Sequence, residues 1–272
     1  MIRKSDKINS VHPINELPIK NMTYPIVENI PFVDTDQMIE VDRAMIEDYH
    51  IELIQMMENA GRNLAHLARN RFLDGDPREK SIVVMAGTGG NGGGGMVAAR
   101  RLHNYGADVT VFLTAEDERF TPIPAHQLDI LRRMGVSIRP AVEINAIKTA
   151  DLILDAVIGY SLKGAPRGNA KLMIEWAMGI SDGIQVPILA LDAPSGIDTA
   201  TGMVFDPAIK ATATMTLALP KKGFFVDGIS TQLGELYLAD ISVPPELYAN
   251  DQLRMDVSSI FAKSDIVQVK IA

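Results

Sequence analysis

The chain has 272 residues, no cysteine and a formal net charge of -8, with 47% hydrophobic and 22% charged residues. The lack of cysteine excludes disulfides, zinc–thiolate sites, iron–sulfur clusters and a cysteine nucleophile. The acidic balance argues against general binding to nucleic acid or to an anionic membrane, and no apolar run approaches the ~20 residues of a membrane span. We therefore expect a cytoplasmic globular protein that binds neither nucleic acid nor membranes.

The N-terminal segment differs in composition from the rest of the chain. Residues 1–33 contain four prolines and charges of both signs, without an uninterrupted apolar stretch. They match neither a secretory signal nor an Arg-rich transit peptide. We expect a partly irregular extension there.

Helical periodicity begins after Asp34. Apolar residues recur at three- and four-residue spacings over 37–48 and 51–72, and Asp34 or Thr35 can cap the first helix. From residue 81, short apolar runs alternate with helical stretches. The expected strands are 82–86, 109–113, 152–157, 187–191, 211–219 and 234–242, and the expected helices between them are 95–105, 124–134 and 169–180. This alternation predicts a three-layer α/β/α domain over 34–250 with a mostly parallel central sheet, followed by a C-terminal tail, 251–272.

A glycine-rich loop, GTGGNGGGG at 87–95, joins the first of these strands to a helix. Its backbone N–H groups and the helix dipole would form a site for phosphate or pyrophosphate. Gly87, Gly89 and Gly92 satisfy the pattern GxGxxG, but no acidic residue is clearly placed at the end of the strand 108–113, as a dinucleotide fingerprint requires. No Lys-Ser or Lys-Thr pair follows the glycines, which excludes a P-loop. The alternative is a surface loop that binds no ligand.

Two further strands end in carboxylates. Asp155 follows the apolar run of DLILDAVIG, and Asp192 follows that of LALDAPSGIDTATG, in which Ser195 comes three residues later. Because ligands bind beyond the carboxyl ends of parallel strands, these polar ends and the glycine loop are expected to converge at one edge of the sheet. Each carboxylate taken singly could instead cap a turn. Ser195 is not part of a GxSxG elbow, so a serine hydrolase is disfavoured.

Six motifs in order resemble the N-terminal domain of the YjeF family, whose best-known activity is NAD(P)H-hydrate epimerase. They are QMIEVDRAMIE with MMENAGR, the glycine loop with MVAARRL, DAVIG, DAPSGIDTATG, LALPKKGF and GELYLADISVPPEL, between residues 34 and 247. The resemblance implies a Rossmann-like α/β/α sandwich, in agreement with the pattern of elements. It also implies a homodimer that interconverts the R and S epimers of hydrated NADH or NADPH, so that a separate dehydratase can restore the cofactor.

The resemblance also implies roles for individual residues. Asn91, Asp155 and Ser195 match positions that bind a potassium ion, and oxygen ligands are what a hard cation prefers. Asp192 matches a substrate-contacting position, and a carboxyl group there is the expected catalytic acid–base group. Lys221 matches the Pro-Lys-x-Gly motif and has a phosphate or acid–base role, or else is a surface lysine in a turn. The expected substrate contacts are Gly90, Asn91, Gly92, Gly93, Gly94, Gly159, Tyr160, Ser161, Leu162, Lys163, Gly164, Ala165, Asp192 and Lys221.

The glycine loop departs from the family at two positions. The family loop usually reads GxGNNGGDG, so Gly90 replaces an asparagine and Gly94 replaces an aspartate. Both changes remove side-chain hydrogen-bond partners and keep the backbone cradle. They favour the alternative of a non-catalytic binding or scaffold module, whereas the polar residues retained at the strand ends favour the epimerase. The hypothesis of a nucleotide-dependent oxidoreductase is supported by GxGxxG alone and is the least favoured.

Overall fold

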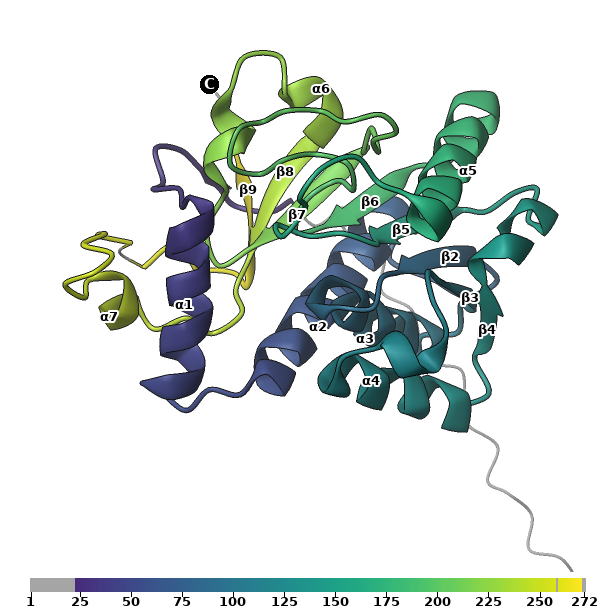
Figure 1. Cartoon of the computed structure of the whole chain (residues 1–272), viewed down its shortest axis with the longest axis horizontal. Coiled ribbons are helices and arrows are strands. Elements are labelled where there is room, and N and C mark those ends of the chain that lie inside the picture. Colours follow the sequence, from purple (N-terminus) through teal and green to yellow (C-terminus); the bar gives the residue numbers. More distant parts are fainter. Residues whose placement is uncertain (1–22, 258, 271–272) are drawn as a thin grey trace, which may run out of the picture.

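A computed structural model of the chain describes residues 23–257 and 259–270. They form a nine-stranded sheet in the order β1-β9-β8-β7-β6-β5-β2-β3-β4 (Figure 1). Strands β8 and β9 are antiparallel, and every other neighbouring pair is parallel. The strands are β1 (Ile26–Val27), β2 (Ser81–Ala86), β3 (Asp108–Leu113), β4 (Ser137–Pro140), β5 (Leu152–Ala156), β6 (Ile188–Leu191), β7 (Ala213–Leu217), β8 (Glu235–Ala239) and β9 (Ile266–Val269). The expected mostly parallel sheet is confirmed.

Helices cover both faces of this sheet. They are α1 (Thr35–Glu47), α2 (Leu53–Phe72), α3 (Gly90–Asn104), α4 (Pro122–Arg133), α5 (Gly168–Ile184), α6 (Ser230–Leu233) and α7 (Pro245–Tyr248), with 3-10 turns η1 (Asp117–Arg119), η2 (Ala141–Ala146) and η3 (Lys222–Phe225). Alternate residues of β2 point to opposite faces, as a pleated strand requires. Ile82 and Val84 pack in one core with α2, α3 and α4, whereas Val83 and Met85 pack in another with α5 and η2. The three-layer sandwich is therefore present.

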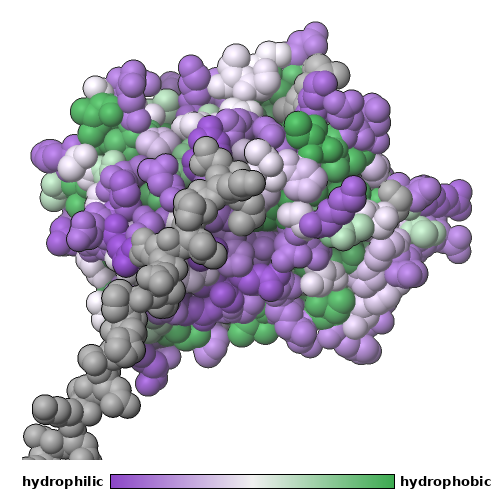
Figure 2. All heavy atoms as spheres, turned by 180° about the vertical axis from the view of Figure 1, so that it is seen from behind, coloured by the Kyte–Doolittle hydropathy of each residue, from purple (hydrophilic) through white to green (hydrophobic). Residues whose placement is uncertain are grey.

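The outer surface is polar where the two cores are apolar. Seen from behind, the molecule is mostly hydrophilic, with apolar residues in small groups between polar ones (Figure 2). The apolar side chains that the periodic patterns single out are instead collected between the sheet and its helices. Helices α1 and α7 lie side by side at one edge (Figure 1), where Met45 of α1 packs with Leu219 and Ile241 from the segments that follow β7 and β8.

The strand order reverses direction between β2 and β5. From β2 the chain builds outward through β3 and β4, and it then returns to β5 and builds outward on the other side through β6, β7 and β8. Ligands of open α/β sheets bind in the crevice at such a reversal, beyond the carboxyl ends of the strands. The glycine loop follows β2 directly, and Asp155 lies near the end of β5, so both lie at this crevice.

The helix α3 begins at Gly90, five residues before the start expected from the apolar pattern. Glycine has low helix propensity, but here the backbone packs so closely that larger residues do not fit. A Cβ on Gly92 would lie 1.8 Å from the carbonyl oxygen of Gly87, and one on Gly95 would lie 2.4 Å from the Cβ of Ala156. Tertiary packing therefore overrides propensity in this turn.

The structure contains three strands that the sequence pattern does not predict. Strand β4 contains Arg139 and Pro140 at the edge of the sheet, so it has no long apolar run. Strands β1 and β9 lie outside the expected range 34–250, yet they pair with each other, and β9 also pairs with β8. The sheet thus extends past both ends of that range. Residues 1–22 of the expected extension lie outside the described residues, as do 271–272 of the tail.

The glycine packing gives a stability prediction with an internal control. We expect Gly95→Ala to lower the free energy of unfolding by about 1–3 kcal/mol, the usual cost of overpacking a core. Gly90→Ala in the same helix should cost nothing, because no atom lies within 4 Å of a Cβ built there. Urea unfolding of the two variants measures the difference, and equal stabilities would contradict the close approach of α3 to the sheet.

Candidate functional site

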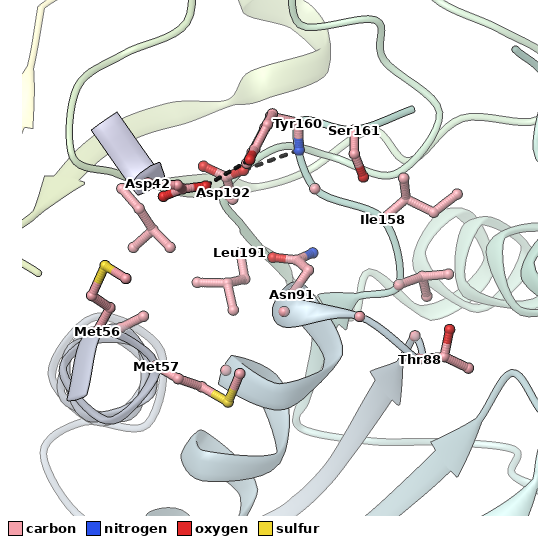
Figure 3. Close-up of a pocket in the computed structure, with 18 of the residues that line it drawn as sticks. Asp42, Met56, Met57, Thr88, Asn91, Ile158, Tyr160, Ser161, Leu191 and Asp192 are labelled. Atoms are coloured by element: carbon pink, nitrogen blue, oxygen red, sulfur yellow. Dashed lines mark hydrogen bonds between the residues drawn. The ribbon is translucent and has the colours of Figure 1, made fainter. Parts of the chain in front are cut away.

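A pocket of about 600 Å³ opens at the crevice between β2 and β5. Its volume lies in the range of about 300–1,000 Å³ that is usual for small-molecule sites. The loop after β2, the loop after β5 and the end of β6 contribute most of its polar residues, and α1 and α2 contribute a largely apolar wall that also includes Asp42 (Figure 3). The lining includes Met38, Asp42, Met56, Met57, Thr88, Gly89, Gly90, Asn91, Gly94, Gly159, Tyr160, Ser161, Leu191 and Asp192.

The glycine loop brings a helix N-terminus to this pocket. Helix α3 begins after Gly89 without a side-chain cap, and Gly90 and Asn91 of its first turn line the pocket. The first N–H groups of a helix have no partners within the helix, and the helix dipole adds partial positive charge. This end of the pocket is therefore suited to an anionic group such as a phosphate.

Asn91 carries a polar group without a partner. Its side chain lies beside Leu191 at the start of α3 (Figure 3), and its Nδ2 atom is buried with no hydrogen-bond partner among the described residues. Gly159 lies close by, because a Cβ there would be 3.4 Å from the Cγ of Asn91 and 3.0 Å from Oδ2 of Asp192. Buried polar atoms without partners are rare in folded proteins, and those in pockets are available to a ligand.

Asp192 is held at both carboxylate oxygens and is only 4% exposed. Its Oδ1 accepts a hydrogen bond from Nζ of Lys221 at 2.5 Å, and its Oδ2 accepts one from the backbone N–H of Tyr160 at 3.1 Å. The backbone of Asp192 has φ 64°, in the left-handed region that non-glycine residues seldom adopt. The carboxylate thus belongs to the pocket wall and does not cap its own turn.

Lys221 is buried behind this carboxylate, with 2% exposure. Its ammonium donates to Asp192 Oδ1, to Thr216 Oγ1 at 3.0 Å and to the carbonyl of Leu217 at 2.9 Å. These contacts use all three donors of a lysine. The alternative of a surface lysine in a turn is therefore wrong. Lys221 is not among the residues that line the pocket, and it contacts that wall through Asp192.

Asp155 and Ser195 bind each other beneath the pocket. Asp155 is fully buried, and its two oxygens accept hydrogen bonds from the Ser195 hydroxyl at 2.6 Å and from the Ser195 N–H at 2.7 Å. The N–H of Val157 lies 3.2 Å from the same carboxylate. Burial raises the pKa of Asp155 to about 6, although these hydrogen bonds oppose the rise. Through its hydrogen bonds to Ser195, the carboxylate connects the end of β5 to the loop after β6.

The oxygen-bearing residues expected to bind potassium fit that ion in their chemistry. They supply an amide, a carboxylate and a hydroxyl, all hard ligands, and no cationic side chain among the described residues contributes to the pKa shift of Asp155. Asn91 is not bonded to Asp155 or Ser195. Its unpartnered atom is Nδ2, a donor that suits an acceptor on a ligand, so a cation would have to bind the amide Oδ1 instead. No group of three His, Cys, Asp or Glu side chains in the described part of the chain is placed to hold a metal. A cation here would rely on amide, hydroxyl and backbone oxygens beside one carboxylate.

Only part of the expected substrate-contacting set lines the pocket. Gly159, Tyr160 and Ser161 do so, together with Gly90, Asn91, Gly94 and Asp192. The other expected positions, Gly92, Gly93, Leu162, Lys163, Gly164, Ala165 and Lys221, are not among the lining residues. Gly93 lies under Met57, whose sulfur would be 2.4 Å from a Cβ at that position.

The two departures from the family loop both fall on the pocket lining. A Cβ on Gly94 would lie 2.8 Å from Cδ2 of Leu191, whereas one on Gly90 would meet no atom within 4 Å. A side chain at position 90 would therefore enter open space, whereas one at position 94 would need Leu191 to move. The loss of the asparagine and the aspartate alters the lining of the pocket and leaves its backbone frame in place.

Asp42 is a lining residue that the sequence analysis missed. It is a carboxyl-bearing residue on the side of α1 that buries Met38, Val41 and Met45, and it lines the pocket. Met38 and Met45 are four residues before and three residues after it, which places all three on one helix face. A single carboxylate on an otherwise apolar face is the signal that could have found it.

Comparisons with known proteins agree with this geometry. The family model described as YjeF-related protein N-terminus matches residues 53–223. An NAD(P)H-hydrate epimerase of Dehalogenimonas lykanthroporepellens is 38% identical over 80% of this chain and 84% of that protein. Another, from Rhodopirellula baltica, is 30% identical over 83% of this chain and 90% of that protein. The chain belongs to the family of YjeF-related N-terminal domains.

Other relatives are longer. A bifunctional NAD(P)H-hydrate repair enzyme Nnr of Moorella thermoacetica is 35% identical over 80% of this chain, which spans 41% of that protein. The crystal structure of the yeast protein ynu0 shares the fold with a TM-score of 0.75 and 24% identity, covering 88% of this chain and 100% of the yeast chain. No helix in the described part of the chain is long and apolar enough to cross a membrane.

The buried ion pair predicts a large effect on stability. Lys221→Met would leave the Asp192 carboxylate buried without its cation, and we expect the free energy of unfolding to fall by about 3–5 kcal/mol. Lys222→Met removes the same charge from the next residue, which is exposed, and should change stability little. Chemical denaturation measures both variants. Equal effects would mean that the ion pair does not hold this edge of the sheet.

Proposed function

We propose that this protein is an NAD(P)H-hydrate epimerase, which interconverts the R and S epimers of hydrated NADH and NADPH. The observation that carries the proposal is the Asp192 carboxylate, held on the pocket wall by Lys221 and Tyr160 beside an uncapped helix N-terminus. Relatives named NAD(P)H-hydrate epimerase, of which this chain covers most of the length, support it.

The reaction requires an acid–base group at the hydroxyl-bearing carbon of the hydrated ring. Its configuration changes only if a bond to that carbon breaks and re-forms, with protons moved to and from oxygen or the ring. A positioned carboxyl group typically contributes ~10² to 10⁴ in rate to such transfers. We propose Asp192 for this role. The N-terminus of α3 would bind the anionic or ribose part of the dinucleotide, and the methionines of α1 and α2 would pack against the ring.

A potassium ion is part of the proposal. Asn91, Asp155 and Ser195 would hold it through oxygen atoms beneath the pocket. Its positive charge would stabilise the buried Asp155 carboxylate and would order the loops after β5 and β6, which carry the substrate-contacting residues. We also propose a homodimer that acts together with a separate dehydratase. The bifunctional repair enzyme of Moorella thermoacetica, a longer relative, supports such a partnership.

The second candidate function is a binding or scaffold module without catalysis. The glycines at positions 90 and 94, where the family usually has asparagine and aspartate, favour it because two polar side chains are missing from the pocket lining. The two candidates differ in one measurable respect. An epimerase accelerates exchange between the epimers, whereas a scaffold binds the dinucleotide and leaves the spontaneous rate unchanged.

The epimerase proposal predicts activity in a coupled assay. With an excess of a dehydratase specific for one epimer, this protein should make the other epimer disappear faster than it does spontaneously. Asp192→Asn is nearly isosteric and keeps an oxygen that can accept from Lys221, so it should lower stability, retain dinucleotide binding and lower turnover by ~10²-fold or more. Asp227→Asn, at an exposed position, is the matched control.

Two results would count against the role of Asp192. A folded variant that binds ligand and turns over at the normal rate would exclude it as the acid–base group. A variant that melts early and loses binding together with turnover would point to a structural role. An unchanged rate with the wild-type protein would instead favour the scaffold.

The potassium proposal predicts an ion-specific stabilisation. At equal ionic strength, K⁺ should raise the melting temperature more than Li⁺, because a ligand that binds the folded state stabilises it. Asn91→Ala should remove this difference, since it deletes one ligand and leaves the Asp155–Ser195 contacts in place. Scanning calorimetry in the two salts tests this. Identical melting temperatures for the wild-type protein would show that no specific site forms.

A further inference from the structure

A second carboxyl group faces the same pocket from α1. Oδ2 of Asp42 accepts a hydrogen bond from the hydroxyl of Tyr160 at 2.6 Å. The backbone N–H of Tyr160 in turn donates to Oδ2 of Asp192 at 3.1 Å. One residue therefore links the two carboxyl groups, and Figure 3 shows all three residues gathered at one end of the pocket. Asp42 lies outside residues 53–223, which the family model matches.

The two carboxyl groups differ in their partners. Asp192 is paired with the ammonium of Lys221. Asp42 instead receives a hydrogen bond from the neutral hydroxyl of Tyr160. The groups that face Asp42 from packed elements are Tyr160, Asp192, Lys221 and, from α7, Tyr248.

The surroundings of Asp42 favour its protonated form. Burial raises its pKa above the ordinary value, the Tyr160 hydrogen bond lowers it, the charge of Asp192 raises it and that of Lys221 lowers it, with a net rise. A carboxyl group whose surroundings favour its neutral form can serve as the acid of a site. Asp42 is such a group, and it lies one residue's length, that of Tyr160, from the ion-paired Asp192.

We infer that Asp42 is a second catalytic residue and donates the proton in the reaction for which Asp192 is the acceptor. This inference rests on the proposed epimerase function. Asp42 protonates the hydroxyl of the hydrate as the C–O bond breaks. The electron pair of that bond goes to the oxygen, which leaves as water, and the adjacent ring nitrogen shares its lone pair with the carbon. Water then adds to the other face of the ring, a new C–O bond forms, and the released proton goes to Asp192. Reaction in the reverse direction, or exchange with solvent, returns the proton to Asp42, so no further reactant is needed.

If Asp42 only positioned Tyr160, variants of these two residues would differ in activity from what a catalytic role predicts. If Asp42 only orients Tyr160, then removing either end of their hydrogen bond should have the same effect. If Asp42 is the acid, then Tyr160→Phe leaves the acid in place and removes a hydrogen bond that favours its charged form. The pKa of Asp42 should then rise further, and the activity of this variant should persist to higher pH.

The test is the pH dependence of kcat/KM, which reports the essential groups of the free enzyme. We expect wild-type kcat/KM to fall as rising pH deprotonates Asp42, and we expect Tyr160→Phe to move this fall to higher pH. Asp42→Asn should lower kcat/KM by ~10²-fold or more and abolish the fall. Asp36→Asn, at an exposed position of the same helix, should match the wild type.

The inference is overturned if Asp42→Asn is active with the wild-type pH profile. It is also overturned if Asp42→Asn and Tyr160→Phe lose activity equally and the pH profile of Tyr160→Phe does not move. If Asp42→Asn does not fold, the direction of the Tyr160→Phe shift decides alone. An inactive wild-type protein counts against the proposed function, whereas an active wild type with an unaffected Asp42→Asn variant counts against this inference alone.

Discussion

The buried ion pair between Lys221 and Asp192 fixes the geometry on which the pocket depends. It joins the end of β6 to the segment after β7, with every lysine donor in use. Such a pair is costly to bury and costly to break, so it locks these segments together. Val33 pairs with Lys221 as an isolated bridge, and its N–H donates to the carbonyl of Pro220 at 2.9 Å. Because α1 begins two residues later, the same anchor places Asp42 at the pocket.

The glycine loop supplies the other rigid part of the site. At Gly87, Gly92 and Gly95, a Cβ would collide with backbone or with the short side chain of Ala156, so the close approach of α3 to the sheet requires glycine. At positions 90 and 94 there is open space or the movable end of a leucine. The two departures from the family loop therefore fall where the frame does not depend on glycine. They alter the lining of the pocket and leave its backbone frame in place.

The sequence predicts the parts of this structure that rest on regular local patterns. Apolar runs mark β2, β3, β5 and β6, and the order of strands and helices brings Asp155 and Asp192 to one edge of a parallel sheet. It does not predict β1 or β4, which are too short or too polar for a periodic signal, or β9, which lies beyond the expected domain range. The burial of Lys221 and the contact between Asp42 and Tyr160 also escape it, because both depend on the packing of segments distant in the chain.

The central claim is that this pocket exchanges the epimers of a hydrated nicotinamide dinucleotide. The most direct measurement starts from one chromatographically separated epimer of hydrated NADH and follows the appearance of the other, with no dehydratase present. We expect the mixture to approach its equilibrium ratio at a rate proportional to the concentration of the protein, with no net oxidation. A rate equal to the spontaneous one at every protein concentration, with the ligand shown to be bound, would contradict it.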